Sequence, residues 1–304
     1  MTVSYFLCVG EALSAKRKPR ALIIGANGFL GSYAVRAATN EFEVVRGLRS
    51  AHDRESVAID IGDTGSVERA FEACKPNVVM LLAAMADIDR CEMQPDLAFA
   101  VNVRGAENVA NACAKTGARL VFTSTAAVFD GRKRGYSEAD PVSPLSVYGS
   151  TKVRAEAVVQ ALVPTVVIVR VSLALGFARR SNANSLVNVL IDRWKVGQAV
   201  HLPTFEYRNP IHVDSLGQIL ARFLGGQFQG IYHIGASDCV SRYELGRRLA
   251  RRGGFPEDFV QPQGESVPNR APRGEHHFLL THKLQELHVA PPQSCDDAIE
   301  RCFS

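Results

Sequence analysis

The sequence has no long hydrophobic run, since no stretch reaches the roughly 18–20 apolar residues that a membrane-spanning helix requires. It also has no strong excess of one charge, because 35 basic residues stand against 31 acidic ones, for a net charge of +4. Proteins that bind nucleic acid usually gather basic residues on one face. Here the densest cluster, Arg247-Arg248 with Arg251-Arg252, has the spacing of a solvated helix face. We therefore expect no membrane span and no nucleic-acid partner.

Paired cysteines and metal-site patterns are absent too. The seven cysteines are an odd number with no Cys-x-x-Cys pair, and the eight histidines lack the spacing of a metal site. Several cysteines stand in apolar surroundings, where a free thiol behaves as a small hydrophobic side chain. We expect reduced cysteines, a cytoplasmic location and no bound metal.

The chain does carry the alternation of strands and helices that is typical of a doubly wound parallel sheet. The run Val78–Ala83 is continuously apolar, as expected of a strand buried on both faces, and 96–115 predicts one long helix. We expect an N-terminal extension at 1–20, an α/β dinucleotide-binding domain at 21–174, and a smaller substrate lobe at 175–304 that is free to interleave with it.

A glycine-rich turn, Gly25-Ala26-Asn27-Gly28-Phe29-Leu30-Gly31, stands between the first expected strand and the first helix. Three glycines alone are weak evidence, because glycine is common in turns. Their place after an apolar strand and before an amphipathic helix is the arrangement that aims backbone N–H groups at a pyrophosphate. The residues of the turn expected to contact a dinucleotide are Gly25, Asn27, Gly28, Phe29, Leu30 and Gly31.

The end of the second strand should select the dinucleotide. An acidic residue there suits the ribose 2′-hydroxyl of NAD, whereas arginine suits the 2′-phosphate of NADP. This chain has Arg46 and Arg49 there, which favours NADP over NAD, although both side chains could simply be solvated. Asp60 and Ile61 follow the third strand, where they can meet the adenine; a plain turn aspartate is the alternative for Asp60.

Three residues suited to proton transfer stand near the expected sheet edge. Tyr148 and Lys152 are four residues apart, on one face of a helix, and Thr125 closes a buried strand. Hydride delivery to a ketone leaves negative charge on its oxygen, which then needs a proton. We expect the Lys152 ammonium to lower the pKa of Tyr148 so that it serves as general acid/base, with Thr125 donating a hydrogen bond to the same oxygen. Tyr148 and Lys152 are also expected to contact the cofactor, with Lys152 anchoring its ribose. A packed tyrosine and a solvated lysine are the structural alternative.

These motifs together resemble the extended short-chain dehydrogenase/reductases, which are Rossmann enzymes acting mainly on nucleotide sugars. Further segments are similar to the dTDP-4-dehydrorhamnose reductase branch: 83–87, 98–103, 128–131 and 208–213. The resemblance implies NADPH-dependent reduction of a 4-keto sugar nucleotide. It also implies that Ala83, Ala84 and Met85 lie along the cofactor and that Asn102 supports the active site.

One segment departs from that branch. Thr125-Ala126-Ala127 stands where the branch usually has Thr-Asp-Tyr, which argues against a sugar-nucleotide dehydratase and is closer to the epimerase pattern. The leading hypothesis is an NADP(H)-dependent reductase of a sugar nucleotide, with Arg208 as a candidate for a substrate phosphate or, alternatively, for a surface salt bridge. An epimerase with retained NAD, and an NADP-binding regulatory subunit like that of methionine adenosyltransferase, remain open. Pairing into a homodimer is also left open.

Overall fold

The computed structural model describes residues 17–51, 53–179, 185–265, 267, 270–289 and 293–304. Most of the expected N-terminal extension, including Cys8, therefore lies outside the described residues. Within the described part, a seven-stranded parallel sheet has the order β11-β6-β5-β4-β1-β2-β3. Its strands, in chain order, are β1 (Arg20–Ile24), β2 (Glu43–Leu48), β3 (Ser56–Ala58), β4 (Val78–Leu81), β5 (Arg119–Thr125), β6 (Val167–Val171) and β11 (Gly230–Ile234). The doubly wound α/β expectation is confirmed.

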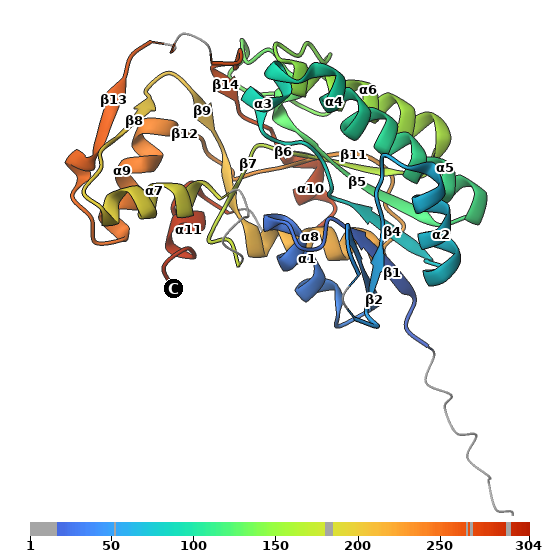
Figure 1. The fold of residues 1–304 in the computed structure, drawn as a ribbon. Helices are drawn as coiled ribbons and strands as arrows, with labels where there is room; N and C mark the ends of the chain where they lie inside the picture. Colours follow the sequence, from blue (N-terminus) through green and yellow to red (C-terminus); the bar gives the residue numbers. More distant parts are fainter. Residues whose placement is uncertain (1–16, 52, 180–184, 266, 268–269, 290–292) are drawn as a thin grey trace, which may run out of the picture.

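Helices cover both faces of this sheet (Figure 1). Side chains alternate across β1, so Leu22 and Ile24 pack into one hydrophobic core while Ala21 and Ile23 pack into the other. The first core is completed by helices α2 (Thr64–Cys74), α5 (Gly105–Thr116) and α6 (Val147–Leu162). The second is completed by α1 (Phe29–Ala38) and α8 (Val213–Gly225).

The strand order reverses at β1, which pairs with β2 on one side and β4 on the other. The chain leaves β1 in one direction toward β3 and returns in the other toward β6. In open α/β sheets the crevice outside the carboxyl ends of the strands at such a point is where ligands bind. The fold therefore predicts a ligand site at the carboxyl ends of β1 and β4.

The helix expected at 96–115 is interrupted. The structure has α3 (Ile88–Met93) and α4 (Pro95–Phe99), then a π-helical segment (Ala100–Arg104) and α5. Gly117 ends α5 in the left-handed conformation, with φ of 72°, as the sequence predicts. Asn102 lies inside the π-helical segment and is only 2% exposed. Its bonds to a neighbouring loop, described below, are tertiary contacts that a 3.6-residue periodicity cannot reveal.

The second half of the chain builds a smaller layer beside the sheet and also returns to the sheet through β11 (Figure 1). Its own core contains Leu190, Trp194, Leu245 and Ile299. The remaining strands are β7 (Leu173–Leu175), β8 (Val200–Pro203), β9 (Tyr207–Arg208), β10 (Pro210–His212), β12 (Val240–Ser241), β13 (Val260–Gln263) and β14 (His276–His277). The remaining helices are α7 (Leu186–Lys195), α9 (Arg242–Arg252), α10 (His282–Glu286) and α11 (Cys295–Glu300).

The cysteines in the described part of the chain are free thiols, and all but Cys239 are buried. Burial raises the pKa of Cys74 and Cys91 to about 11, so both thiols stay protonated at neutral pH. These cysteines act as small core side chains. Among the described helices, none combines the length and the apolar character needed to cross a bilayer.

Candidate active site

The glycine turn brings backbone into close contact with backbone. Gly25 has φ of +88°, and a Cβ placed on it would lie 2.8 Å from the backbone nitrogen of Ala83. A Cβ on Gly31 would lie 2.1 Å from the carbonyl oxygen of Gly25, so any side chain there would collide with the turn. Gly28 is the N-cap of α1, whose first N–H groups point out of the helix end. The sequence uses glycine here because the turn and the helix must touch.

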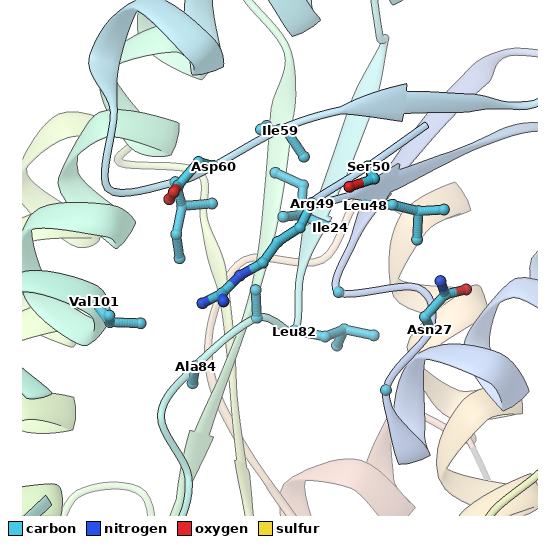
Figure 2. Close-up of a pocket in the computed structure, with 15 residues that line it drawn as sticks. Ile24, Asn27, Leu48, Arg49, Ser50, Ile59, Asp60, Leu82, Ala84 and Val101 are labelled. Atoms are coloured by element: carbon cyan, nitrogen blue, oxygen red, sulfur yellow. The ribbon is translucent and has the colours of Figure 1, made fainter. Parts of the chain in front are cut away.

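A cavity of about 500 Å³ opens above this turn, at the reversal point of the sheet (Figure 2). Figure 2 shows the Arg49 side chain reaching from the end of β2 into the pocket, with its guanidinium on the side of Ala84 and Val101. The cavity is lined by residues from the ends of β1 to β4, the glycine turn and the π-helical segment: Ile24, Gly25, Asn27, Gly28, Gly47, Leu48, Arg49, Ser50, Ile59, Asp60, Ile61, Leu82, Ala83, Ala84 and Val101.

Most of the residues expected to bind a dinucleotide line this one cavity. Asp60 does so while its carboxylate also accepts a hydrogen bond of 2.9 Å from the Gly62 N–H, as expected of a turn aspartate. The expected residues outside the lining are Phe29, Leu30, Gly31, Arg46, Met85, Tyr148 and Lys152. Val101 was missed by the sequence reasoning, because only the tertiary fold brings the π-helical segment to the cavity.

The two arginines of the second strand have different surroundings. Arg46 lies within β2 and forms an ion pair with Asp53, which lies in the loop that follows the strand. Arg49 lies past the end of β2 and lines the cavity. Arg46 is thus engaged by the Asp53 carboxylate, seven residues away, whereas Arg49 is available to a ligand in the cavity.

Tyr148 lies in the first turn of α6, the helix that packs against β5 at this edge of the sheet. Ser146 caps this helix and accepts a hydrogen bond of 3.1 Å from the Gly149 N–H. Tyr148 packs against a small core that includes Met85 and Cys91. A hydrogen bond with Thr125 favours the phenolate, but burial outweighs it and raises the pKa of Tyr148 to about 12. The structure therefore brings Thr125 and Tyr148 together.

Lys152 lies one helical turn further on and is only 3% exposed. Its ammonium nitrogen stands 4.1 Å from the centroid of the Phe122 ring. Burial lowers the pKa of Lys152 to about 8, although the Glu156 carboxylate opposes the shift. The expectation that Lys152 lowers the pKa of Tyr148 is wrong for this arrangement, because desolvation of the phenol dominates and Lys152 is itself desolvated.

A buried polar network lies behind Lys152. Arg170 donates hydrogen bonds of 3.0 and 2.7 Å to the two carboxylate oxygens of Glu156, and the Ser124 hydroxyl donates one of 2.5 Å. Burial and the neighbouring Arg170 lower the pKa of His233, which lies 3.4 Å from Arg170, to about 3, so its ring is neutral. Sequence reasoning missed this network because its members come from a helix and three strands.

Asn102 connects the π-helical segment to the same site. Its amide oxygen accepts a hydrogen bond of 2.8 Å from the Met85 N–H, and its amide nitrogen donates bonds of 3.0 Å to the Met85 carbonyl and to the Thr151 hydroxyl. One side chain therefore fixes the loop after β4 against α6, next to Tyr148.

Arg208, the expected phosphate ligand, is 6% exposed and largely engaged by protein groups. Its Nη2 donates to Glu206, and its Nη1 donates to the carbonyl oxygens of Tyr207, Gly274 and Glu275. It borders a second cavity of about 120 Å³ that also reaches Thr125. Arg208 therefore ties β9 to the segment before β14, rather than forming a surface salt bridge.

The parallel sheet, its reversal point and the glycine turn define a Rossmann-type α/β protein. The chain belongs to the family described as the RmlD substrate binding domain, whose model matches residues 19–304. The resemblance given by the sequence motifs is thereby confirmed.

Individual relatives carry different names. The chain is 28% identical to methionine adenosyltransferase 2 subunit beta of Xenopus laevis, over 89% of this chain and 83% of that protein. It is 29% identical to dTDP-4-dehydrorhamnose reductase of Aggregatibacter actinomycetemcomitans, over 82% of each. The solved structure of dTDP-4-dehydrorhamnose reductase from Bacillus anthracis, in complex with NADP, matches with a TM-score of 0.85 and 26% identity, over 94% of this chain and 99% of that one.

Proposed function

We propose that this protein is an NADP(H)-dependent oxidoreductase of the short-chain dehydrogenase/reductase type that reduces a keto group of a sugar nucleotide. The observation that carries the proposal is the hydrogen bond between Thr125, at the end of β5, and Tyr148, with Lys152 one helical turn further along α6, in a sheet whose neighbouring strand ends form the glycine-turn cavity. The similar reductase solved with NADP supports the choice of cofactor.

The cavity fits a dinucleotide phosphate. The turn at Gly25 and Gly28 offers unhindered backbone to a pyrophosphate, and Arg49 with Ser50 would hold the 2′-phosphate. Asp60 would face the adenine. The cofactor, when bound, supplies the hydride.

The chain's own residues would then handle the proton. A phenol whose pKa is raised to about 12 stays protonated at neutral pH, which is the form that reduction of a ketone consumes. Tyr148 would donate its proton to the carbonyl oxygen, while the Thr125 hydroxyl donates a hydrogen bond that orients that oxygen. Lys152, one helical turn further along α6, would anchor the cofactor ribose.

The direct test compares Tyr148→Phe with the parent in NADPH-dependent reduction of dTDP-4-dehydrorhamnose. We expect unchanged NADPH affinity and a loss of turnover of about 10²–10⁴-fold, because the proton donor is gone while the cofactor cavity is intact. Tyr243→Phe is the matched control and should leave turnover unchanged, because the Tyr243 ring lies beside Arg247 and lines neither the glycine-turn cavity nor the cavity at Thr125. Equal rates for Tyr148→Phe and the parent would exclude the proposed mechanism.

A second candidate function is a non-catalytic subunit that binds NADP and acts through a larger enzyme. The similarity to methionine adenosyltransferase 2 subunit beta favours it, as does the Ala126-Ala127 pair where the reductase branch has Asp and Tyr. Tight NADPH binding without turnover on a panel of keto sugar nucleotides, together with copurification of a larger enzyme, would favour this candidate. A cytoplasmic location stays a prediction under both candidates.

A further inference from the structure

The smaller cavity beside Thr125 is rich in arginine. It encloses about 120 Å³, and its lining includes the guanidinium-bearing residues Arg208, Arg242 and Arg273. Because Thr125 lines the same cavity, substituents next to a carbonyl held at Thr125 would extend toward these arginines. The cavity therefore belongs to the substrate side of the proposed site.

Two of the three arginines already have protein partners. Arg208 is bound by Glu206 and by carbonyl oxygens. Arg273 donates hydrogen bonds of 3.1 and 2.8 Å to the two carboxylate oxygens of Asp89. Their charges are balanced by these carboxylates, so both arginines hold the cavity wall together.

Arg242 differs from both. It is the first residue of α9, and its backbone N–H donates a hydrogen bond of 2.8 Å to the Glu206 carbonyl oxygen, which fixes its position. Its Nε is buried and has no hydrogen-bond partner among the described residues, whose recorded ion pairs do not include Arg242. Burial lowers the pKa of Arg242, and the Glu206 carboxylate balances its charge only in part. A desolvated guanidinium of this kind is costly, and an anionic ligand would supply the missing charge.

The surrounding charge points the same way. The guanidinium groups of Arg208, Arg242 and Arg273 are joined by that of Arg270, which pairs with Glu206. The carboxylates facing this group are Glu206 and Asp89. His277 also lines the cavity, but burial lowers its pKa to about 3 and leaves it neutral. The cavity thus carries an excess of positive charge.

We propose that Arg242 is the residue that binds a phosphate group of the substrate, and that Arg208 has a structural role. The inference rests on the proposed function, since it takes Thr125 as the carbonyl site. The volume of the cavity suits one phosphate group rather than a whole sugar nucleotide, and the planar fork of an arginine matches phosphate oxygens. Arg242 therefore contributes to selecting a phosphorylated ketone over a neutral one.

The test uses the full chain saturated with NADPH and two probes, inorganic pyrophosphate and thymidine diphosphate, titrated calorimetrically. For Arg242→Gln we expect the Kd of both probes to rise about 10- to 100-fold, with the Kd of NADPH unchanged. Arg242→Lys keeps the charge but not the fork and should be intermediate. Arg247→Gln, one turn away on the same helix and paired with Glu257 at the surface, is the matched control and should bind like the parent.

A second measurement guards against misfolding. Because the Arg242 charge is desolvated and only partly balanced in the free chain, Arg242→Gln should melt at or above the temperature of the parent. Arg208→Gln should melt lower, because it removes one of the two arginines that pair with the buried Glu206. Pyrophosphate should raise the melting temperature of the parent but not of Arg242→Gln.

The outcomes separate the two proposals. A parent that fails to bind NADPH contradicts the proposed function. A parent that binds NADPH but binds neither probe, or an Arg242→Gln variant that binds the probes as well as the parent does, overturns the assignment of Arg242 alone.

Discussion

Replacing Lys152 by methionine should make the protein more stable at pH 7 while removing its activity. The reason is the buried ammonium, whose pKa falls from 10.5 to about 8 on folding. Each unit of pKa difference corresponds to about 1.4 kcal/mol, so holding this charge in the folded chain costs about 3 kcal/mol at pH 7. Methionine has a similar shape and removes that cost.

Two contacts of Lys152 reduce the expected gain. The substitution removes the cation–π contact with Phe122, worth about 0.5–2 kcal/mol, although a methionine sulfur near the ring returns part of it. Glu156 is not left unpaired, because Arg170 and Ser124 still donate hydrogen bonds to it. We therefore expect Lys152→Met to raise the free energy of unfolding by about 1–3 kcal/mol at pH 7.

The pH dependence gives this prediction its sharpest form. Between pH 8 and pH 10.5 the unfolded chain still holds the proton that the folded chain has released, so parental stability rises with pH in this window. The advantage of Lys152→Met should therefore shrink to less than about 1 kcal/mol at pH 10. Urea unfolding of both proteins at pH 7 and pH 10 measures the difference.

The control for this experiment is Lys115→Met, since the Lys115 side chain is 68% exposed and pairs with Glu68 at the surface. It should change stability by less than about 0.5 kcal/mol at either pH. If Lys152→Met is less stable than the parent at pH 7, or if its advantage is the same at pH 10, the ammonium is not a desolvated charge and the reasoning fails.

Three further predictions test the cavity and the buried network. Arg49→Ala should raise the Kd of NADPH about 10- to 100-fold and leave that of NADH unchanged. Arg46→Ala breaks only the pair with Asp53 and should affect both cofactors equally. Equal effects of the two substitutions on the preference for NADPH over NADH would contradict the assignment. Gly31→Ala should cost about 1–3 kcal/mol of stability and abolish dinucleotide binding, because its Cβ would lie 2.1 Å from the Gly25 oxygen, while Gly264→Ala, with open space around it, should do neither. His233 is neutral in the fold, because its pKa is lowered to about 3, so the unfolded chain takes up the proton first as pH falls. The free energy of unfolding should therefore drop by about 2 kcal/mol from pH 6.5 to pH 5. A His233→Asn variant whose stability falls equally steeply with pH would refute this.

Local patterns predicted the sheet and the glycine turn because their causes are local. The continuous apolar run at Val78–Ala83 reflects burial on both faces, and β4 occupies most of it. The left-handed cap at Gly117 follows from a conformation that side chains rarely adopt. The boundary drawn after residue 174 stays a prediction, although β11 shows that chain order and spatial order differ in the second half.

What the sequence could not supply depends on partners that are distant along the chain. Arg46 and Arg49 look alike until Asp53 is seen to pair with one of them. The direction of the Tyr148 pKa shift could not be deduced from the presence of Lys152, because burial of the phenol is the largest cause of that shift. Similarly, only the tertiary structure shows that Arg208 has protein partners and that the Nε of Arg242 lacks one among the described residues.

Two desolvated cations of the free chain, Lys152 and Arg242, belong to opposite sides of one proposed site. Each is desolvated, and its charge is only partly balanced by the carboxylates nearby. Under the proposed function, the ligands bring hydroxyl and phosphate groups to these two positions. Binding would then relieve costs that folding alone leaves in place, so cofactor and substrate should each stabilise the chain by more than their buried area implies. If Lys152 and Arg242 had no ligand to bind, the folded chain would be more stable without these two charges.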